Sequence, residues 1–230
     1  MIPQLIVHHH LGLGDHFICN GLIHHILDTL AHEVRLPTKK KNLDTVKHLY
    51  EDYEHVKVID AGDLDLSREI LSVNQLSINK NVPLLKISYN GSGESYFDKP
   101  FYEQLGFDFD LRWEKFTMPL HTDGIFIMSK VRSDPTEPFI LVHNSGSVGR
   151  FDLNIDSDLP VVEIDETLSS SLIDWWQVIS SATEIHCIDS SVIHLADSLN
   201  LDRVRKLVYH DVGRGSKFHL KNNWQVQTYK

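Results

Sequence analysis

Three short segments combine residue types that bind or transform anionic and hydroxyl-bearing ligands. The first is GLGD, residues 12–15, in which two glycines precede a carboxylate. The second is HNSGSVGR, residues 143–150, with hydroxyls, glycines and an arginine. The third is IDSSVIHL, residues 188–195, in which a carboxylate and two serines precede a histidine. Each segment follows an apolar run, so the surrounding elements decide what these side chains meet.

The first half of the chain alternates between strand-like and helix-like patterns. Residues 4–9 predict a strand, and residues 17–31, with apolar side chains four apart, predict a helix. Residues 32–38 and 56–62 predict two more strands, separated by a helix that begins at Asn42 or Asp44. A further strand is expected within residues 82–90 and helical structure within 97–107. This order is typical of a parallel sheet covered by helices.

The second half repeats the pattern. Strands are predicted within residues 138–146, 159–165, 184–191 and 204–213, and helices within 169–182 and 192–200. Residues 119–134, followed by Pro135 and Pro138, are interpreted as the connection between the two halves. We therefore expect an α/β protein with two domains, residues 1–118 and 119–230.

Composition excludes several classes of protein. With 230 residues, 41% hydrophobic residues and a formal charge of −10, the chain predicts a folded domain without the basic surface of a nucleic-acid groove. Cys19 and Cys187 lie in apolar patterns and are expected to be buried free thiols. No signal peptide or transmembrane segment is predicted, so a cytoplasmic location is expected.

The first loop has two interpretations. Gly12 and Gly14 allow the backbone to approach a ligand, and Asp15 either faces that ligand or caps the helix that follows. A dinucleotide site is disfavoured because Phe17 stands where the dinucleotide fingerprint has its third glycine. His10, at the end of the strand, is a candidate ligand contact.

The second loop is able to hold a diphosphate through backbone amides, Ser145, Ser147 and Arg150, or it is an ordinary polar turn. Carboxylates follow the next strand. Glu163, Asp165 and Glu166 are alternative acceptors for ribose hydroxyls, and solvated loop charges are the other interpretation.

The third loop begins a helix directly after a strand. Ser190 and Ser191 are expected at the N-terminus of this helix, with His194 one turn further on. In one parallel sheet the second and third loops would lie at the same edge, which favours a shared anion site over two unrelated turns.

The fifteen histidines do not indicate a metal site. His8, His9 and His10 are consecutive, so the middle side chain of a strand points away from the other two. His24 and His25 are adjacent helix positions and do not face one ligand. No metal and no cofactor are expected.

Together the first and third loops resemble motifs of the two-lobed GT-B glycosyltransferases, especially the ADP-heptose:lipopolysaccharide heptosyltransferase group, family 9. That group has a G-x-G-D loop before its first helix and a D-[ST]-G-x-x-H-L-A-x-A segment near its C-terminus. The matching positions are Gly12, Gly14, Asp15, Asp189, Ser190, His194, Leu195 and Ala196. Ser191 stands where the family has glycine.

The resemblance implies two Rossmann-like lobes with parallel sheets, an acceptor-side N-terminal lobe and a nucleotide-sugar-binding C-terminal lobe. It implies a metal-independent transfer of sugar from a nucleoside diphosphate sugar to a glycan or other hydroxyl, with Asp15 as general base. The implied donor contacts are Asp189, Ser190, Ser191 and His194, with Ser145, Ser147 and Arg150 stabilising the leaving diphosphate. Arg214 and Lys217 are further candidates for that charge.

Two other functions suit the same features. A nucleotide-sugar epimerase of the same architecture would need acid and base groups flanking the sugar and no acceptor site. A non-catalytic binding protein would keep the nucleotide-sugar site and carry out no turnover.

Overall fold

The chain divides into two compact units, each built around its own parallel sheet. The computed structural model describes residues 1–63, 65–87, 96–120, 123–146, 149–215 and 217–229. Unit 1 is Met1–Pro119 with Lys217–His219, and unit 2 is Leu120–Ser216 with Leu220–Lys230. The chain therefore leaves unit 1 after Pro119, returns to it for three residues and then completes unit 2.

The sheet of unit 1 has four parallel strands in the order β3-β2-β1-β4. Ile6 of β1 pairs with Arg35 of β2 on one side and with Leu84 of β4 on the other. All four residues of β1 are buried, as expected of a central strand covered on both faces. The strands are β1 Leu5–His8, β2 Val34–Thr38, β3 Val56–Asp60 and β4 Leu84–Lys86.

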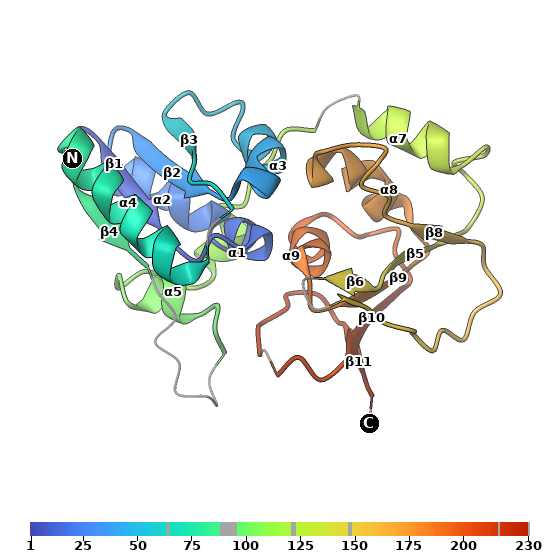
Figure 1. Ribbon diagram of the computed structural model, residues 1–230. Helices are drawn as coiled ribbons and strands as arrows, with labels where there is room; N and C mark the ends of the chain where they lie inside the picture. The colour runs from blue at the N-terminus through green and yellow to red at the C-terminus, as the bar shows by residue number, and fades with distance from the viewer. Residues whose placement is uncertain (64, 88–95, 121–122, 147–148, 216, 230) are drawn as a thin grey trace. The chain divides into compact units, whose positions relative to one another are not determined.

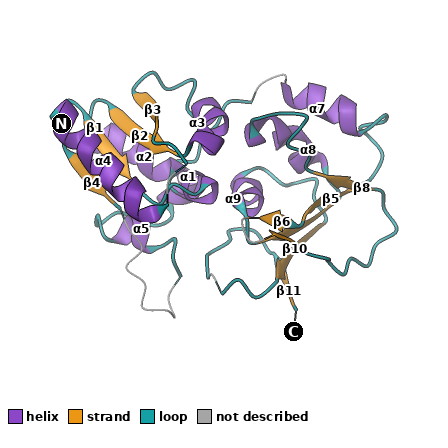
Figure 2. Ribbon diagram, viewed as in Figure 1, coloured by secondary structure: helices purple, strands orange, loops and turns teal. Residues whose placement is uncertain are grey.

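Helices lie on both sides of this sheet (Figure 2). They are α1 Leu13–Ile18, α2 Asn20–Thr29, the 3₁₀ turn η1 Lys40–Asn42, α3 Leu43–Leu49, α4 Leu66–Lys80, α5 Pro100–Glu103 and α6 Leu111–Glu114. The single helix predicted over 17–31 was wrong in detail, because α1 begins earlier and the chain is divided at Cys19 into two helices. Gly21 gives α2 its close contact with α6, because a Cβ there would collide with the backbone carbonyl of Leu111.

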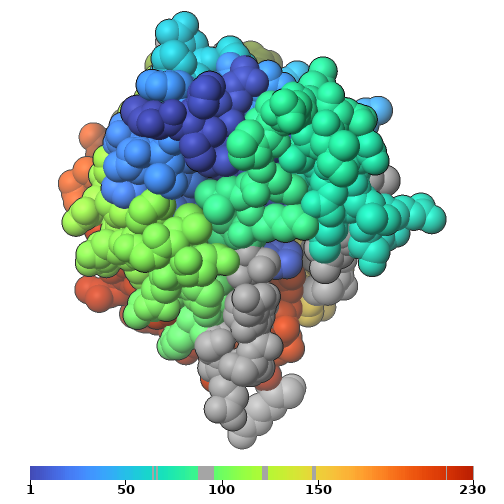
Figure 3. Space-filling model, turned by 90° about the vertical axis from the view of Figure 1, so that its left-hand side faces the viewer, coloured from blue at the N-terminus to red at the C-terminus, as the bar shows by residue number. Residues whose placement is uncertain are grey.

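Helix α4 was not predicted from the sequence. It begins after Asp65, whose carboxylate accepts the backbone N–H of Arg68 at 3.0 Å, and it ends at Asn81 in the left-handed conformation. Val73 packs on Ile6 of the sheet. The opposite face of α4 forms part of the outer surface of unit 1 (Figure 3), where Leu71 and Ile78 are exposed.

Unit 2 contains a five-stranded parallel sheet in the order β11-β10-β9-β5-β8 (Figure 1). Its strands are β5 Ile140–His143, β8 Val161–Glu163, β9 Glu184–Ile188, β10 Lys206–Asp211 and β11 Gln225–Thr228. A short antiparallel pair, β6 Ser145–Gly146 and β7 Gly149–Arg150, follows β5. The helices are α7 Asp123–Val131, η2 Leu172–Trp175, α8 Trp176–Ser181 and α9 Ser191–Ser198. Helix α7 replaces the expected connection, and β11 was not predicted.

A chain of hydrogen bonds ties the C-terminal strand to the rest of the unit 2 sheet. His186 contacts Glu184 at 3.2 Å and His210 at 2.9 Å, and His210 contacts the Tyr229 hydroxyl at 2.6 Å. The carboxylate requires a donor, so His186 donates from Nε2 and accepts at Nδ1 from His210, which in turn accepts from Tyr229. All four ring nitrogens of His186 and His210 thus have a partner while both imidazoles are neutral.

The predictions about the cysteines and about membrane-spanning segments can be compared with the described residues. Cys19 and Cys187 are buried and form no disulfide, as predicted. No described helix combines the length and the apolar character needed to cross a membrane.

Candidate functional site

The loop after β1 places a carboxylate inside the first turn of α1. Gly12 is the N-cap residue in an extended conformation, no side chain caps the helix, and Asp15 is its third residue. Asp15 therefore does not occupy the cap position itself, although the positive end of the helix favours its charge. A Cβ on Gly12 would lie 2.6 Å from Oδ2 of Asp15. The half-buried carboxylate thus lies against the glycine backbone, where any larger residue would displace it.

Two buried imidazoles lie next to this loop. His9 and His16 are fully buried, with ring centroids 4.5 Å apart in an edge-to-face arrangement. Nδ1 of His9 bonds the carbonyl of His10 at 2.7 Å. Within the described residues, Nε2 of His9 and both ring nitrogens of His16 have no hydrogen-bond partner. Burial lowers the pKa of His9 to about 4 and that of His16 well below its usual value, so both are neutral near pH 7.

His10 is half-buried at the same end of unit 1. Its ring lies 6.3 Å from that of Phe101, and burial lowers its pKa. Gly14, in the first turn of α1, is also half-buried. One loop and the first turn of α1 therefore bring together four predicted site residues, as their sequence positions required: His10, Gly12, Gly14 and Asp15.

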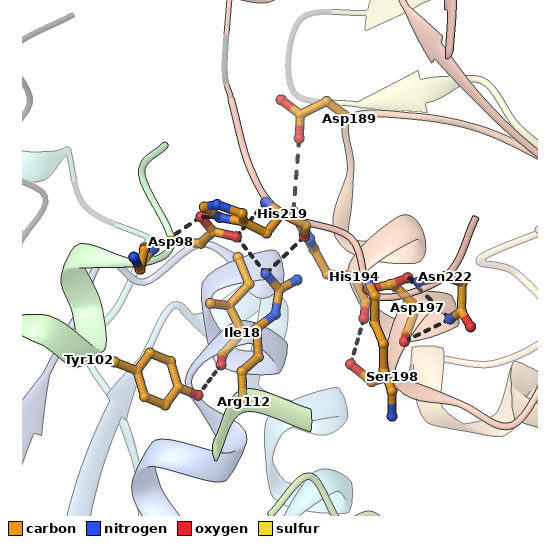
Figure 4. A network of polar contacts seen from close by, with 12 residues as sticks. Ile18, Asp98, Tyr102, Arg112, Asp189, His194, Asp197, Ser198, His219 and Asn222 are labelled. Carbon is orange, nitrogen blue, oxygen red and sulfur yellow. Dashed lines mark hydrogen bonds and ion pairs between the residues drawn. The ribbon is translucent and has the colours of Figure 1, made fainter. Parts of the chain in front are cut away.

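A buried ion pair in the same unit fixes Lys217–His219. Arg112 donates to Asp98 at 2.5 Å with both side chains fully buried, and it also donates to the carbonyl of His219 at 3.0 Å (Figure 4). Asp98 in turn accepts the backbone N–H of His219 at 2.7 Å and its Nδ1–H at 2.9 Å. Lys217 is exposed and its carbonyl accepts the N–H of Phe97. Lys217 therefore belongs to unit 1, whereas the predicted diphosphate contacts Ser145, Arg150 and Arg214 belong to unit 2.

This ion pair lies within electrostatic range of the first loop. Burial and the neighbouring Asp15 carboxylate raise the pKa of the Cys19 thiol, an effect that Arg112 opposes and Asp98 reinforces. The hydroxyl of Tyr102 donates to the carbonyl of Ile18, at the end of α1, at 2.7 Å (Figure 4). The end of α1 is thus held by a side chain from α5.

In unit 2 the second and third loops leave the same edge of the sheet. Strands β5 and β9 are paired in parallel, with His143 opposite Cys187, so the residues that follow them emerge side by side. The expected adjacency of these two loops is confirmed. Nδ1 of His143 lies 3.0 Å from Oγ of Ser190 and links them directly.

The third loop holds a carboxylate, an arginine and the start of α9. Ser190 is the N-cap residue, yet no side chain caps α9. Asp189 is buried and lies 3.9 Å from Nε2 of His194 (Figure 4). It also lies 3.8 Å from the guanidinium of Arg214. Arg214 also donates to the carbonyl of Asp189. Ser191 is half-buried as the first residue of α9.

The second loop is a hairpin rather than an open phosphate cradle. Ser145 and Gly146 pair with Gly149 and Arg150, and Ser147 lies outside the described residues. The guanidinium of Arg150 donates to both carboxylate oxygens of Glu163, at 2.7 and 2.6 Å. Arg150, predicted to contact the diphosphate, and Glu163, predicted to contact the ribose, are therefore both exposed and bonded to each other.

The two alternatives to Glu163 lie further along the chain. Asp165 accepts hydrogen bonds from the backbone and hydroxyl of Thr167, which lower its pKa, so its carboxylate serves a local turn. Glu166 is exposed.

Sequence reasoning missed four residues that organise these loops. His143 contacts Ser190. Asp98 and Arg112 hold His219 (Figure 4). Asp197 of α9 accepts hydrogen bonds from the backbone of Lys221 and Asn222 and from Trp224 Nε1. Only His143 had a signal in the sequence, because it ends a predicted strand. The other pairings join residues that no spacing rule connects.

The described residues include no group of three or more His, Cys, Asp or Glu side chains arranged to hold a metal ion. The absence of a metal requirement stays a prediction.

Two units, each with a parallel sheet flanked by helices and with polar loops at strand ends, define a GT-B-like fold with Rossmann-like lobes. Solved structures that share this fold include glycosyltransferases. The chain is similar to the glycosyl transferase family 9 protein from Veillonella parvula DSM 2008, with a TM-score of 0.65 and 10% identity over 99% of this chain and 87% of that one. The predicted fold class is confirmed.

Two Escherichia coli proteins give the same result. ADP-heptose LPS heptosyltransferase II matches with a TM-score of 0.62 and 11% identity, covering 98% of this chain and 90% of that one. Heptosyltransferase WaaC with ADP matches with a TM-score of 0.51 and 10% identity, covering 100% of this chain and 94% of that one. No protein-family model and no curated protein matches the sequence. At these identities the likeness concerns the fold.

Proposed function

We propose that this protein is a metal-independent glycosyltransferase that transfers a sugar from a nucleoside diphosphate sugar to a hydroxyl acceptor. Unit 1 binds the acceptor and supplies Asp15 as general base, and unit 2 binds the donor. The observation that carries the proposal is the placement of Asp15, a half-buried carboxylate held against Gly12 at a strand end, in a chain with the fold of glycosyltransferases.

The proposed chemistry at Asp15 is proton removal. The acceptor oxygen attacks the anomeric carbon, forming a new glycosidic bond, while the bond from that carbon to the diphosphate oxygen breaks. The acceptor hydroxyl gives its proton to the Asp15 carboxylate as its oxygen forms the bond to the anomeric carbon. The N-terminus of α1 favours the negative charge of Asp15, the form of the carboxylate that accepts a proton.

The leaving diphosphate acquires negative charge, which the loops of unit 2 are proposed to receive. The Ser190 side chain does not cap α9, and the first N–H groups of this helix are proposed to bind phosphate oxygens. Arg214, held by the carbonyl of Asp189, supplies positive charge at the same loop. Ser190, Ser191 and His194 lie on or beside the first turn of α9 and complete the proposed donor contacts. Arg150 would have to release Glu163 to join them.

The donor is proposed to be an ADP-sugar, with ADP-heptose the first to test. Two similar structures support this choice by their names, one an ADP-heptose LPS heptosyltransferase and the other a heptosyltransferase with ADP. A glycan is the proposed acceptor.

The decisive experiment replaces Asp15 by Asn. Asn keeps the shape and cannot take the proton, so transfer from ADP-heptose or another nucleotide sugar should fall by roughly 10³-fold, within the range for loss of a general base. ADP affinity, measured by isothermal titration calorimetry, should stay within twofold. Asp44→Asn is the matched control, because Asp44 is also an acidic residue in the first turn of a unit 1 helix, α3, but is exposed.

The outcome separates three functions. Loss of transfer with retained binding supports the transferase. An epimerase would interconvert the bound nucleotide sugar without an acceptor, and this conversion is detectable by NMR of the sugar. A binding protein would bind nucleotide sugar and be indifferent to Asp15→Asn. If ADP, GDP, UDP and their sugars all fail to bind the wild-type protein, the proposal is wrong.

A further inference from the structure

Unit 1 contains a cavity of about 520 Å³ at the end of its sheet opposite to the Asp15 loop. The residues that line it are His24, Leu27 and Asp28 of α2, His32 before β2, and 52–55 before β3. Because the strands are parallel, the segments that precede β2 and β3 lie at one edge of the sheet. The loop with Asp15 follows β1 and lies at the other edge. The cavity is therefore separate from the candidate site.

The lining of this cavity is negatively charged. Lys115, directly after α6, donates to Asp28 at 2.5 Å and compensates that carboxylate. Asp52 and Glu54 are exposed, and no described lysine or arginine pairs with either of them. Glu54 lies 3.6 Å from Nε2 of His55, which is charged only when it is protonated. Ionised carboxylates only accept hydrogen bonds, so a ligand here must supply donors and gains from positive charge.

A buried imidazole adds an unpaired nitrogen to the lining. His24 is only 8% exposed, and its Nε2 lies 3.2 Å from the Thr117 hydroxyl, which in turn lies 2.6 Å from the Tyr53 hydroxyl. Nδ1 of His24 has no hydrogen-bond partner among the described residues. Burial lowers the pKa of His24 to about 4, so the ring is neutral near pH 7. Since the ring lines the cavity and Nε2 is held by Thr117, Nδ1 is the nitrogen left for a ligand.

The direction of this hydrogen-bonded chain decides what it offers the cavity. If Nε2–H of His24 donates to Thr117 and Thr117 donates to Tyr53, Nδ1 is an acceptor. If the chain runs the other way, Nδ1–H is a donor and the Tyr53 oxygen is the acceptor. Both ends line the cavity, and the two rings lie 4.2 Å apart. Each direction therefore leaves one acceptor in the cavity, beside the carboxylates.

We propose that this cavity binds a small organic polyamine. Asp52 and Glu54 hold its ammonium groups, and the chain of His24, Thr117 and Tyr53 accepts one further N–H. An ammonium N–H selects the tautomer in which Nδ1 of His24 accepts, because this nitrogen lies in the lining and has no other partner in the described part of unit 1.

The remaining properties of the cavity fit the same ligand class. Leu27 and the ring of Tyr53 provide apolar and aromatic surface for the methylene groups that separate the ammonium groups. The volume is within the usual range for small-molecule sites. A metal ion is a poorer occupant, because the described residues include no group of three or more His, Cys, Asp or Glu side chains arranged to hold one. The inference does not depend on the proposed function.

The test titrates spermidine into the whole protein by isothermal titration calorimetry near pH 7.5, at low and at high salt. Spermidine should bind at low salt with a dissociation constant of about 0.1 mM. Putrescine, which has one ammonium group fewer, should bind more weakly. Mg²⁺ at the same ionic strength should not displace spermidine, because it offers neither N–H donors nor methylene groups.

Neutralising the two carboxylates tests the charged part of the site. Asp52→Asn combined with Glu54→Gln should weaken spermidine binding about tenfold at low salt, and the difference from the wild type should shrink at high salt, because exposed charges are screened. The matched control combines Asp44→Asn with Glu103→Gln. It makes the same change of charge at exposed positions of unit 1 outside the cavity and should bind spermidine like the wild type.

Replacing the buried imidazole tests the uncharged part. His24→Phe keeps a ring and removes Nδ1, so spermidine binding should weaken about tenfold at both salt concentrations, as expected for one hydrogen bond to a charged group. His16→Phe, at a buried position of unit 1 outside the cavity, is the matched control. Imidazole ¹⁵N spectra, with His24 assigned from the variant, should show Nδ1 unprotonated in the complex. Circular dichroism checks folding, and the exposed carboxylate variant remains informative if His24→Phe does not fold.

Three results would overturn the inference. One is the absence of saturable binding at roughly tenfold higher spermidine concentration. Another is equal weakening by the two charge-neutralising double variants, which would mean that spermidine responds only to the net charge of −10. The third is unchanged binding by His24→Phe together with fixed His24 signals. None of these results affects the proposed function, and Asp15→Asn should bind spermidine like the wild type because Asp15 lies at the other edge of the sheet.

Discussion

The two units contain the same local construction, a parallel strand followed by a polar loop and a helix, with opposite electrostatic results. After β1 the carboxylate of Asp15 lies inside the first turn of α1, so the helix end already faces a negative charge. After β9 the carboxylate of Asp189 precedes α9, is engaged by Arg214 and leaves the helix end uncapped. The first junction displays an anion, and the second is the junction that we propose receives one. A base and a diphosphate site need these opposite arrangements.

The histidines behind the two junctions also differ. His9 and His16 are buried beside the first loop with three ring nitrogens that lack partners among the described residues. His143, behind the second loop, is bonded to Ser190. Burial keeps these imidazoles neutral at both junctions, but only the second junction uses its imidazole to orient a loop side chain. In the described residues, His143 thus contacts a side chain of the third loop, whereas the ring of His16 has no hydrogen-bond partner.

The largest effect is expected from moving the Asp15 carboxylate without removing it. The backbone of Gly12, at φ −67° and ψ 144°, suits alanine, but the new Cβ would come within 2.6 Å of Oδ2 and push the carboxylate aside. Gly12→Ala should therefore lower the rate of transfer about 100-fold, as a misplacement of roughly 1 Å can do. ADP affinity and the midpoint of urea unfolding should be unchanged. Unchanged transfer would show that the position of Asp15 beside Gly12 has no catalytic meaning.

A smaller effect is expected at the second junction. Arg214→Gln removes the positive charge beside Asp189 and should weaken ADP binding about tenfold, or about 1.4 kcal/mol. The rate at saturating donor should change less than threefold, because the contact is made before and during transfer. Arg203→Gln, an exposed arginine of unit 2, is the matched control. Equal affinity of the two variants for ADP would remove Arg214 from the donor site.

Both sheets were predictable because their strands are buried apolar runs separated by helical patterns. The elements that were missed lack that signal. Helix α4 is rich in Ser, Asn and Gln, and only its end signals, Asp65 and Asn81, identify it. Helix α7 exposes Ile125 and Phe126, so its apolar residues do not form a simple buried stripe. The edge strand β11 is the short, mostly exposed segment QVQT, recognisable only beside β10.

For the candidate site in unit 2, the sequence predicted which loops leave the same edge of the sheet. It did not predict which side chains form hydrogen bonds with each other. Parallel topology alone brings the ends of β5 and β9 side by side. The pairing of Arg150 with Glu163 depends on the hairpin formed by β6 and β7, which glycine and serine content does not specify. The placement of Lys217 in unit 1 depends on bonds from Asp98 and Arg112 to His219, residues more than 100 positions away in the sequence.

The smallest effect tests the difference between the two sets of histidines with one substitution. His16→Phe keeps a ring in place of an imidazole whose nitrogens have no partner in the described part of unit 1, so it should stabilise the protein by about 1 kcal/mol at pH 7.5. His143→Phe leaves the Ser190 hydroxyl without its bond and should destabilise by about 1 kcal/mol. Urea unfolding of each variant measures both values.

The pH dependence of the unfolding free energy tests independently whether His16 destabilises the folded protein. The pKa of His16 in the folded protein lies well below 6.5, so below pH 6.5 the unfolded chain takes up a proton that the folded protein refuses. Wild-type stability should therefore fall as pH decreases from 6.5 toward the folded pKa, and the advantage of His16→Phe should grow by up to about 1.4 kcal/mol per pH unit. His32→Gln, at an exposed position, should leave the pH slope unchanged. If His16→Phe destabilises and the slope stays the same, His16 is satisfied by a buried water, and the two junctions are more alike than their protein contacts indicate.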